Sequence, residues 1–246
     1  MRIEFINAMG KPQNRVQINN RFPTYNDYLS HEWEKFRQSP ERWKASLDAV
    51  SEVNVRRALD IGCGAGQEML PFVSKGAEGV GIDVMPEVGQ VGRQLYSEEG
   101  LIEKVTFLRA SGNHLPFADE TFDVLICRVA LSFMDNKSAL REMARVMAPG
   151  GKFLLKYQSP NYYWNKLRSG IVEAYPKSSI YAARVLYAGY VYQLTGRQTY
   201  DPFTAAGEIF QTERTLKREI EPLGLRVTGY LPDTNVLTPS VVITKQ

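Results

Sequence analysis

The chain has few cysteines and few histidines, with two of each among 246 residues. Cys63 and Cys127 lie in separate segments, so they give neither the spacing of a zinc site nor a disulfide framework. We therefore predict no metal site and a reducing, cytoplasmic compartment. No apolar run approaches the roughly 18 residues of a membrane-spanning helix, and the N-terminal stretch lacks the apolar core of a secretory signal peptide.

The excess of positive over negative charge is also small. The net charge is +3, and no block of five like charges occurs, which argues against a dedicated nucleic-acid groove. Hydrophobic residues make up 43% and charged residues 23% of the chain, an ordinary globular composition. The length suffices for one large α/β domain with room for an insertion.

The most informative segment is ALDIGCGAGQ, residues 58–67. Its pattern predicts a strand that ends in a tight glycine loop and continues into a helix, because glycine takes positive φ freely and lets a ligand approach the backbone. A dinucleotide fingerprint, G-x-G-x-x-G, would need its third glycine at position 67, where Gln67 stands. The alternative to a ligand site is a turn whose glycines serve backbone geometry alone.

The spacing D-x-G-x-G-x-G resembles the first motif of the class I S-adenosylmethionine-dependent methyltransferases. This resemblance implies S-adenosyl-L-methionine as cofactor and S-adenosyl-L-homocysteine as product. It places Asp60 near the methionine amino group, and it places the loop residues Gly62, Cys63, Gly64 and Gly66 around the amino-acid portion of the cofactor.

A second short strand, residues 76–84, ends at Asp83 and Val84. In a βαβ unit this end lies beside the glycine loop, where a carboxylate can accept hydrogen bonds from both ribose hydroxyls. The alternative is a turn acid that caps a helix starting near Met85 and Pro86.

Residues 105–131 resemble a block shared by the type 11-like small-molecule group of that family, which includes the quinone-biosynthesis C-methyltransferases. The shared letters are LPF at 115–117 and FD at 122–123. The family acid that faces the adenine aligns with Ser111, so the chain departs from the pattern there. The resemblance assigns the adenine edge and the methionine side of the cofactor to Ser111, Gly112, Asn113 and Arg128.

A helix-to-strand block at residues 139–156 completes the resemblance, which covers residues 54–156. It implies an α/β, doubly wound, Rossmann-like sheet of seven strands, six parallel and the last antiparallel. The final strands, expected at 225–231 and 236–245, would form the closing hairpin. That hairpin favours a methyltransferase over the next enzyme class considered, an NAD-dependent oxidoreductase.

We expect residues 1–50 to be an N-terminal cap segment and residues 51–246 the methyltransferase domain. Residues 1–20 look irregular and polar, whereas Ser39 and Pro40 predict a helix start. In the resembling family such a cap lies over the cofactor, so Tyr25, Tyr28 and His31 are candidates to touch cofactor or acceptor. The alternative is that these aromatic side chains only hold the cap to the core.

Residues 158–207 hold eight of the 13 tyrosines and form an insertion after the fifth strand, ahead of a helix expected at 208–222. Insertions here commonly form a lid over the methyl acceptor in the resembling family. A lid would turn Tyr162, Tyr187 and Tyr190 toward the acceptor. A homodimer interface and a helix buried in an enlarged core are the alternatives.

The sequence therefore predicts methyl transfer to a small-molecule acceptor, by O- or N-methylation of a ring-bearing or anionic metabolite. Many members of the resembling group carry a histidine pair after the fourth strand, where this chain has Ser132 and Phe133. His31 is the better base candidate, since His114 precedes the LPF letters. An acceptor that is already nucleophilic needs no base. A protein that binds the cofactor without transferring a methyl group is the remaining alternative.

Overall fold

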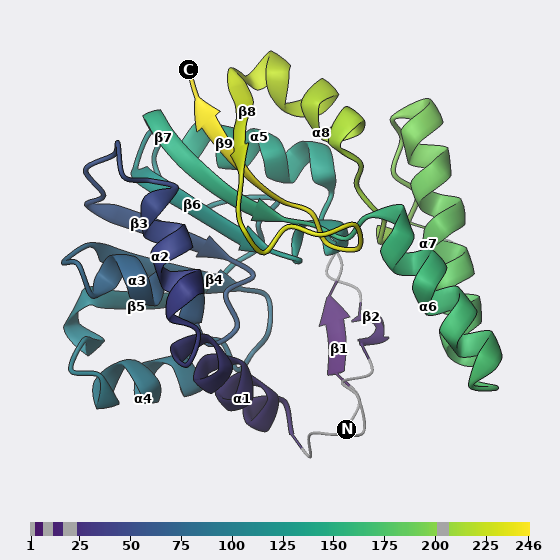
Figure 1. Cartoon of the computed structure of the whole chain (residues 1–246), viewed down its shortest axis with the longest axis horizontal. Coiled ribbons are helices and arrows are strands. Elements are labelled where there is room, and N and C mark those ends of the chain that lie inside the picture. The colour runs from purple at the N-terminus through teal and green to yellow at the C-terminus, as the bar shows by residue number, and fades with distance from the viewer. Residues whose placement is uncertain (1–2, 7–11, 17–23, 201–206) are drawn as a thin grey trace.

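A seven-stranded sheet forms the centre of the computed structural model, which describes residues 3–6, 12–16, 24–200 and 207–246. Its order is β5-β4-β3-β6-β7-β9-β8 (Figure 1). β9 lies between β7 and β8 and runs antiparallel to both, whereas the other pairs in this sheet are parallel, which confirms the expected Rossmann-like sheet of six parallel strands and one antiparallel strand. The strands are β3 (Arg57–Ile61), β4 (Glu78–Asp83), β5 (Val105–Arg109), β6 (Phe122–Arg128), β7 (Met147–Lys156), β8 (Leu225–Tyr230) and β9 (Ser240–Lys245).

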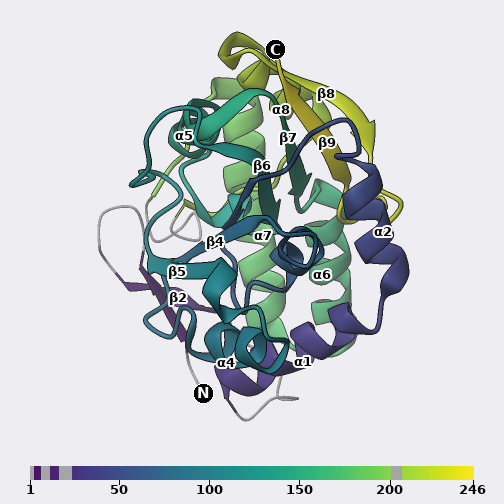
Figure 2. The ribbon, with the colours of Figure 1, turned by 90° about the vertical axis from the view of Figure 1, so that its left-hand side faces the viewer.

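Helices cover both faces of the sheet, as Figure 2 shows for α2 and α5 on opposite sides. One face carries α1 (Tyr25–Arg37), α2 (Pro40–Asp48), α3 (Leu70–Val73) and α4 (Gln90–Glu98), and the other carries α5 (Asn136–Val146) and α8 (Glu213–Ile220). Side chains along β6 alternate between the two faces of the sheet. Val124 and Ile126 pack in the core under α1 to α4, and Leu125 and Cys127 pack in the core under α5 and α8. All four side chains are buried, as expected for a strand covered on both faces.

A helical hairpin of α6 (Pro160–Val172) and α7 (Pro176–Thr195) stands beside this three-layer body (Figure 1). It occupies the position of the expected insertion, and α7 includes the nearly uncharged run of residues 180–194. Throughout the part of the chain that the structure describes, none of the helices is long and apolar enough to cross a membrane.

Two sequence expectations about secondary structure were wrong. Within residues 1–20, expected to be irregular, β1 (Ile3–Ile6) and β2 (Pro12–Val16) pair as an antiparallel ribbon. The helix expected at 208–222 begins only at Glu213, where Thr212 caps it by accepting the N–H of Thr215 at 3.2 Å. By contrast, the helix expected after the glycine loop is present, as one 3₁₀ turn followed by the four residues of α3.

The start of α2 was predicted correctly, with Pro40 at its first position. However, the hydroxyl of Ser39 does not cap α2. It donates to the carbonyl of Lys35 in the last turn of α1, with 2.8 Å between oxygens. Ser39 therefore ties the two helices together at their junction, a role that needs the carbonyl of the preceding helix.

Candidate functional site

The candidate site lies at the carboxyl ends of β3 and β4. The chain proceeds from β3 to β4 on one side and reaches β6 on the other, so the strand order reverses beside β3. Open α/β sheets bind ligands outside the carboxyl ends of the strands at such a switch point. The glycine loop follows β3 at this place, which agrees with its predicted role.

The loop is built from glycines in left-handed backbone conformations. Gly62, Gly64 and Gly66 have φ angles of +74°, +55° and +77°. A Cβ added to Gly62 would lie 2.4 Å from the Cβ of Ala130. The N–H groups of Gly62 and Cys63 both donate to the carbonyl of Ile82, at 2.8 and 3.0 Å. The loop is therefore fixed to the end of β4, and Gly62 is required for conformation and for space.

Asp83 closes the other side of the loop. Its Oδ2 accepts the N–H of Gly64 at 3.1 Å, and its Oδ1 accepts the N–H of Met85 at 3.0 Å. Burial raises the pKa of this carboxyl group, and the two backbone hydrogen bonds oppose the rise. The bond to Met85 matches the turn interpretation. Because a carboxylate offers about four acceptor positions, both oxygens can still accept ribose hydroxyls.

Asp60 is the charged group buried most deeply in the site, with 1% of its surface exposed. Its Oδ2 has no hydrogen-bond partner among the described residues, and the same holds for Oε1 of Gln67, which follows the glycine loop, and for Oε2 of Glu87, which raises the pKa of Asp83. Burial raises the pKa of Asp60 well above its usual range, Glu68 and Asp83 raise it further, and Arg128 lowers it. Buried polar atoms without partners are rare, so these oxygens fit a ligand that supplies donors and positive charge.

The segment expected at the adenine edge uses its side chains to hold its own loop. Ser111 Oγ accepts the N–H of Asn113 at 3.2 Å, and Asn113 Oδ1 accepts the N–H of Asp135 at 3.0 Å. Gly112 is buried, and a Cβ there would lie 2.7 Å from the sulfur of Met134. Val84 is half-buried and its carbonyl accepts from Arg109 Nε at 3.1 Å. Adenine contacts of Ser111, Gly112, Asn113 and Val84 remain predictions.

Arg128, expected on the methionine side, directs its guanidinium into an ion-pair network. It binds Asp233, lies 3.6 Å from Glu68, and lines a cavity of about 480 Å³ beside α2. Its charge still lowers the pKa of Asp60, and so acts on the site electrostatically. A direct cofactor contact of Arg128 stays a prediction. The next residue, Val129, has a φ of +56°, an unusual value for a β-branched side chain and typical of strained functional loops.

Helix α1 packs against the glycine loop. The Cδ2 atom of Leu29 lies 3.0 Å from the position of a Cβ on Gly64. Tyr25 is half-buried, and burial followed by Asp83 raises the pKa of its hydroxyl. Its ring stacks on Tyr28, with centroids 6.1 Å apart. Tyr25 and Tyr28 pack against the core and hold α1 to it, and their contact with cofactor or acceptor stays a prediction.

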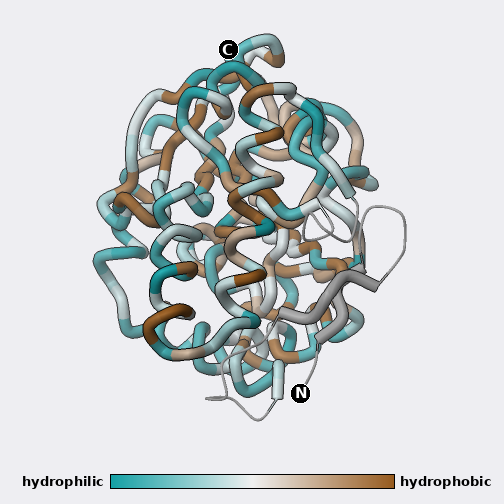
Figure 3. The backbone as a smooth tube through the Cα atoms, turned by 90° about the vertical axis from the view of Figure 1, so that its right-hand side faces the viewer, coloured by the Kyte–Doolittle hydropathy of each residue, from teal (hydrophilic) through white to brown (hydrophobic). Residues whose placement is uncertain are grey.

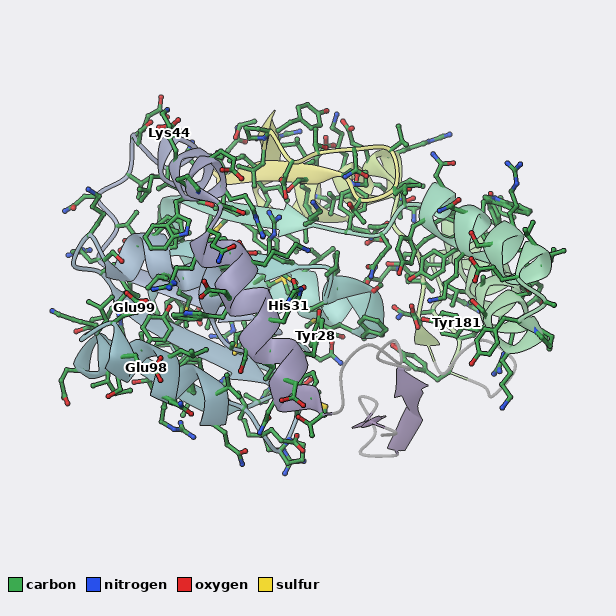
Figure 4. All side chains as sticks on the ribbon, turned by 60° about the horizontal axis from the view of Figure 1, so that its bottom comes forward. Tyr28, His31, Lys44, Glu98, Glu99 and Tyr181 are labelled. Carbon is green, nitrogen blue, oxygen red and sulfur yellow. The ribbon has the colours of Figure 1, made fainter. Side chains whose placement is uncertain are left out.

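Tyr28 on α1 interacts with a tyrosine of the α6–α7 hairpin. Its pKa is raised to about 12 by burial, by Glu32 and by Tyr162 of α6. His31, the base candidate from the sequence, is exposed on α1. Figure 4 shows Tyr28 and His31 on α1, with Tyr181 of α7 across from them. The effect of Tyr162 on Tyr28 relates the insertion to the cap, although the two residues are more than 100 positions apart in the sequence.

The hairpin turns only some of its tyrosines inward. Tyr162 is half-buried, as expected, but Tyr187 is 64% exposed. Tyr190 is 45% exposed, packs its ring against Phe210 and accepts the indole N–H of Trp164 at 3.2 Å. Exposed positions do not by themselves support the expected acceptor contacts of Tyr187 and Tyr190, and these contacts stay predictions. Residues seven apart share a helix face, and the face of α7 that bears Tyr187 points outward.

Glu208 is the polar residue of this region that the sequence interpretation missed. It is 5% exposed, accepts the hydroxyl of Tyr163 at 2.7 Å, and accepts the hydroxyl of Tyr181. Burial raises its pKa to about 7, against the effect of both tyrosines and of Lys166. The only sequence signal was an acid between Gly207 and two apolar residues, where an exposed helix turn was expected.

The backbone beside Glu208 connects it to the end of β6. The N–H of Ile209 donates to the carbonyl of Ser132 at 3.2 Å. Ser132 Oγ in turn donates to Gln158 Oε1 at 2.8 Å. Ser132 is where the resembling family commonly carries a histidine, so the segment that carries Glu208 joins the backbone at that position.

Comparison with known proteins places these residues in a family context. Residues 59–155 match the family model described as a methyltransferase domain. The uncharacterized methyltransferase YcgJ of Bacillus subtilis is 41% identical over 100 residues, which are 40% of this chain and 39% of that protein. The ubiquinone/menaquinone biosynthesis C-methyltransferase UbiE of Azotobacter vinelandii is 34% identical over 140 residues, covering 55% of this chain and 53% of that protein.

A solved S-adenosylmethionine-dependent methyltransferase from Aquifex aeolicus shares the fold, with a TM-score of 0.52 at 18% identity, over 87% of this chain and 98% of that one. The chain spans about half or less of the length of the two curated relatives described above. The matched domain contains Asp60, Asp83 and the glycine loop. Helices α1, α6 and α7, and Glu208, lie outside it.

Proposed function

We propose that this chain, whose residues 59–155 match the methyltransferase-domain model, is an S-adenosylmethionine-dependent methyltransferase acting on a small molecule. The observation that carries the proposal is the pair of acids at the glycine loop. Asp60 is buried with an oxygen that lacks a partner among the described residues, and Asp83 keeps acceptor capacity on both oxygens. These groups fit the amino group and the ribose diol of the cofactor.

When bound, the cofactor supplies an electrophilic methyl group on a sulfonium sulfur. The residues of the chain orient the acceptor and the cofactor and exclude water from them. Leu29 and Tyr25 cover the glycine loop, and so exclude water from it. Holding the acceptor in line with the methyl group lowers the barrier by about 7–11 kcal/mol in well-oriented systems. The burial of Asp60 strengthens its attraction for a cationic ligand.

The acceptor side is aromatic. Tyr28 on α1 and Tyr162 on α6 are close enough for one to raise the pKa of the other, and Tyr181 on α7 contributes to the same raised-pKa cluster. Half-buried phenol rings suit a ring-bearing acceptor, whose faces stack on them. We propose an acceptor with a ring hydroxyl. Loss of that proton prepares either the oxygen or the ring carbon for methylation, which accommodates both O-methylation and the C-methylation named for the UbiE relatives.

Glu208 is the proposed proton acceptor for this step. Tyr181 is half-buried and donates to Glu208. As the acceptor hydroxyl gives its proton to the oxygen of Tyr181, the proton of Tyr181 passes to the carboxylate of Glu208. A carboxyl group with a pKa of about 7 is suited to accept a proton near neutral pH. This role replaces the one that the sequence gave to His31.

Cofactor choice provides the first test. We expect titration calorimetry to give micromolar binding of S-adenosylmethionine, about −8 kcal/mol, and comparable binding of S-adenosylhomocysteine. NAD should give no heat of binding, because Gln67 occupies the position of the third dinucleotide glycine. Tight NAD binding would overturn the proposal. Cofactor binding without product, in a screen of phenolic acceptors, would instead support a binding protein that lacks transferase activity.

A further inference from the structure

The outer side of the α6–α7 hairpin is unusually apolar for an exposed surface. Of the eleven large hydrophobic side chains that are exposed among the described residues, eight belong to this hairpin. Val172 at the hairpin turn and Leu194 near the end of α7 are the most exposed, at 85% and 86%. Scattered exposed apolar residues need no explanation, but a concentration of them on one element marks an interaction surface.

The exposed residues of α7 form a continuous stripe. Ile180, Tyr187 and Leu194 follow one another at intervals of seven and are all exposed, so they share one helix face. At about 1.5 Å per residue the stripe extends for about 21 Å. The opposite face, with Val185 and Gly189, is buried against the body of the insertion. Helix α7 is thus apolar on its packed face and on its outer face, and only the packed face is covered by the described residues.

Positive charge accompanies this stripe. Residues 160–197 contain five Lys or Arg residues and one acid, Glu173. Arg168, Lys177 and Arg197 are exposed. Apolar and aromatic side chains beside Lys and Arg are the composition with which helices bind the interface of anionic bilayers. Figure 3 views this side of the molecule, where hydrophobic and hydrophilic segments alternate along the helices.

We propose that the outer face of the hairpin, made of Ile171, Val172, Ile180, Tyr187 and Leu194, docks on the surface of an anionic lipid bilayer. The side chains enter the boundary between headgroups and acyl chains, and the exposed cations contact the lipid headgroups. A second copy of the chain is a poorer occupant. A two-fold interface places the same patch on both sides, and each patch brings three exposed cations, Arg168, Lys177 and Arg197, against one exposed acid, Glu173. This proposal does not depend on the proposed function.

Vesicle flotation of the full chain tests the proposal. We expect binding to vesicles of phosphatidylcholine with phosphatidylglycerol, weaker binding to phosphatidylcholine alone, and weaker binding at high salt. The triple variant Ile180→Ser, Tyr187→Ser, Leu194→Ser should bind at least about tenfold less, because each side chain loses its apolar contact. The double variant Arg168→Glu, Lys177→Glu should lose about fivefold or more per position. All three apolar positions are exposed, so the fold should survive, as circular dichroism can verify.

Val236→Ser is the matched control, since Val236 is 72% exposed and lies outside the hairpin. It should bind vesicles like the unchanged protein. The proposal is overturned if the chain does not bind anionic vesicles, if it binds neutral and anionic vesicles equally, or if the triple variant binds like the control. A dimer in sizing chromatography that the triple variant converts to monomer, without vesicle binding, would assign the same face to a second copy.

Discussion

Replacing Glu208 with Gln should lower kcat for methyl transfer by about 10²–10⁴-fold, the usual contribution of a general base. Glutamine has the same shape and keeps a carbonyl oxygen for one of the two tyrosine hydroxyls that Glu208 accepts. It cannot take up the acceptor's proton. Since Glu208 lies outside the glycine loop, the dissociation constant of S-adenosylmethionine should stay within about twofold, well under the tenfold that 1.4 kcal/mol represents. Steady-state kinetics and calorimetry on the same preparation give both values.

The pH dependence separates a proton acceptor from a structural residue. With its pKa raised to about 7, Glu208 is protonated at acidic pH, so the rate should rise as pH increases through about 7. The Glu208→Gln variant should have lost that rise. The free energy of unfolding should change in the opposite direction to the rate and decrease as pH rises. A carboxyl group whose pKa is raised in the folded state stabilises the fold at pH values below its unfolded pKa, and this contribution is lost as pH rises through the folded pKa.

Glu219→Gln is the matched control for this experiment. Glu219 also has a raised pKa caused by burial, and it also accepts a tyrosine hydroxyl, that of Tyr192. Its side chain lies between α7 and α8 rather than beside Tyr162. The control should keep kcat close to that of the unchanged protein. Full activity of the Glu208→Gln variant, or an equal loss in both variants, would remove Glu208 from the proton path without affecting the assignment of the cofactor.

Replacing Asp83 with Ala should weaken S-adenosylmethionine binding at least tenfold. The change removes two ribose hydrogen bonds to a charged acceptor, each worth about 1.5–3 kcal/mol. The affinity of the Asp83→Asn variant should lie between those of the unchanged protein and the Asp83→Ala variant, because the Asn amide keeps one acceptor oxygen for the N–H of Gly64 or Met85. Calorimetric titration of all three proteins measures the series.

Asp123→Ala controls for the backbone contacts that are lost with Asp83. Asp123 also accepts two N–H groups, those of Arg56 and Arg57, at 2.8 and 3.0 Å. These bonds lie at the amino ends of β3 and β6, away from the glycine loop. Asp123→Ala should lower thermal stability and leave cofactor affinity unchanged. If the Asp83→Ala variant also bound the cofactor with unchanged affinity, Asp83 would be only an acid that caps a turn.

The glycine loop and its two acids were accessible from the sequence because their signals are local. A glycine at every second position, followed by an acid one strand later, specifies a backbone that needs positive φ at Gly62, Gly64 and Gly66. Hydrophobic runs of strand length likewise predicted β3, β4 and β6. The number and direction of the strands, six parallel and one antiparallel, came from the family resemblance, and the sheet confirmed them.

Contacts between distant segments were not accessible in that way. Pairing of β1 with β2, the approach of Tyr28 to Tyr162, and the burial of Glu208 under Tyr163 and Tyr181 join residues whose own neighbours carry no signal of the partner. The outward face of Tyr187 has the same origin, since composition says that a helix is apolar but not which side another helix covers. Local conformational preference therefore specified the glycine loop, whereas packing of the cap and the hairpin produced the proposed acceptor side and the exposed apolar stripe.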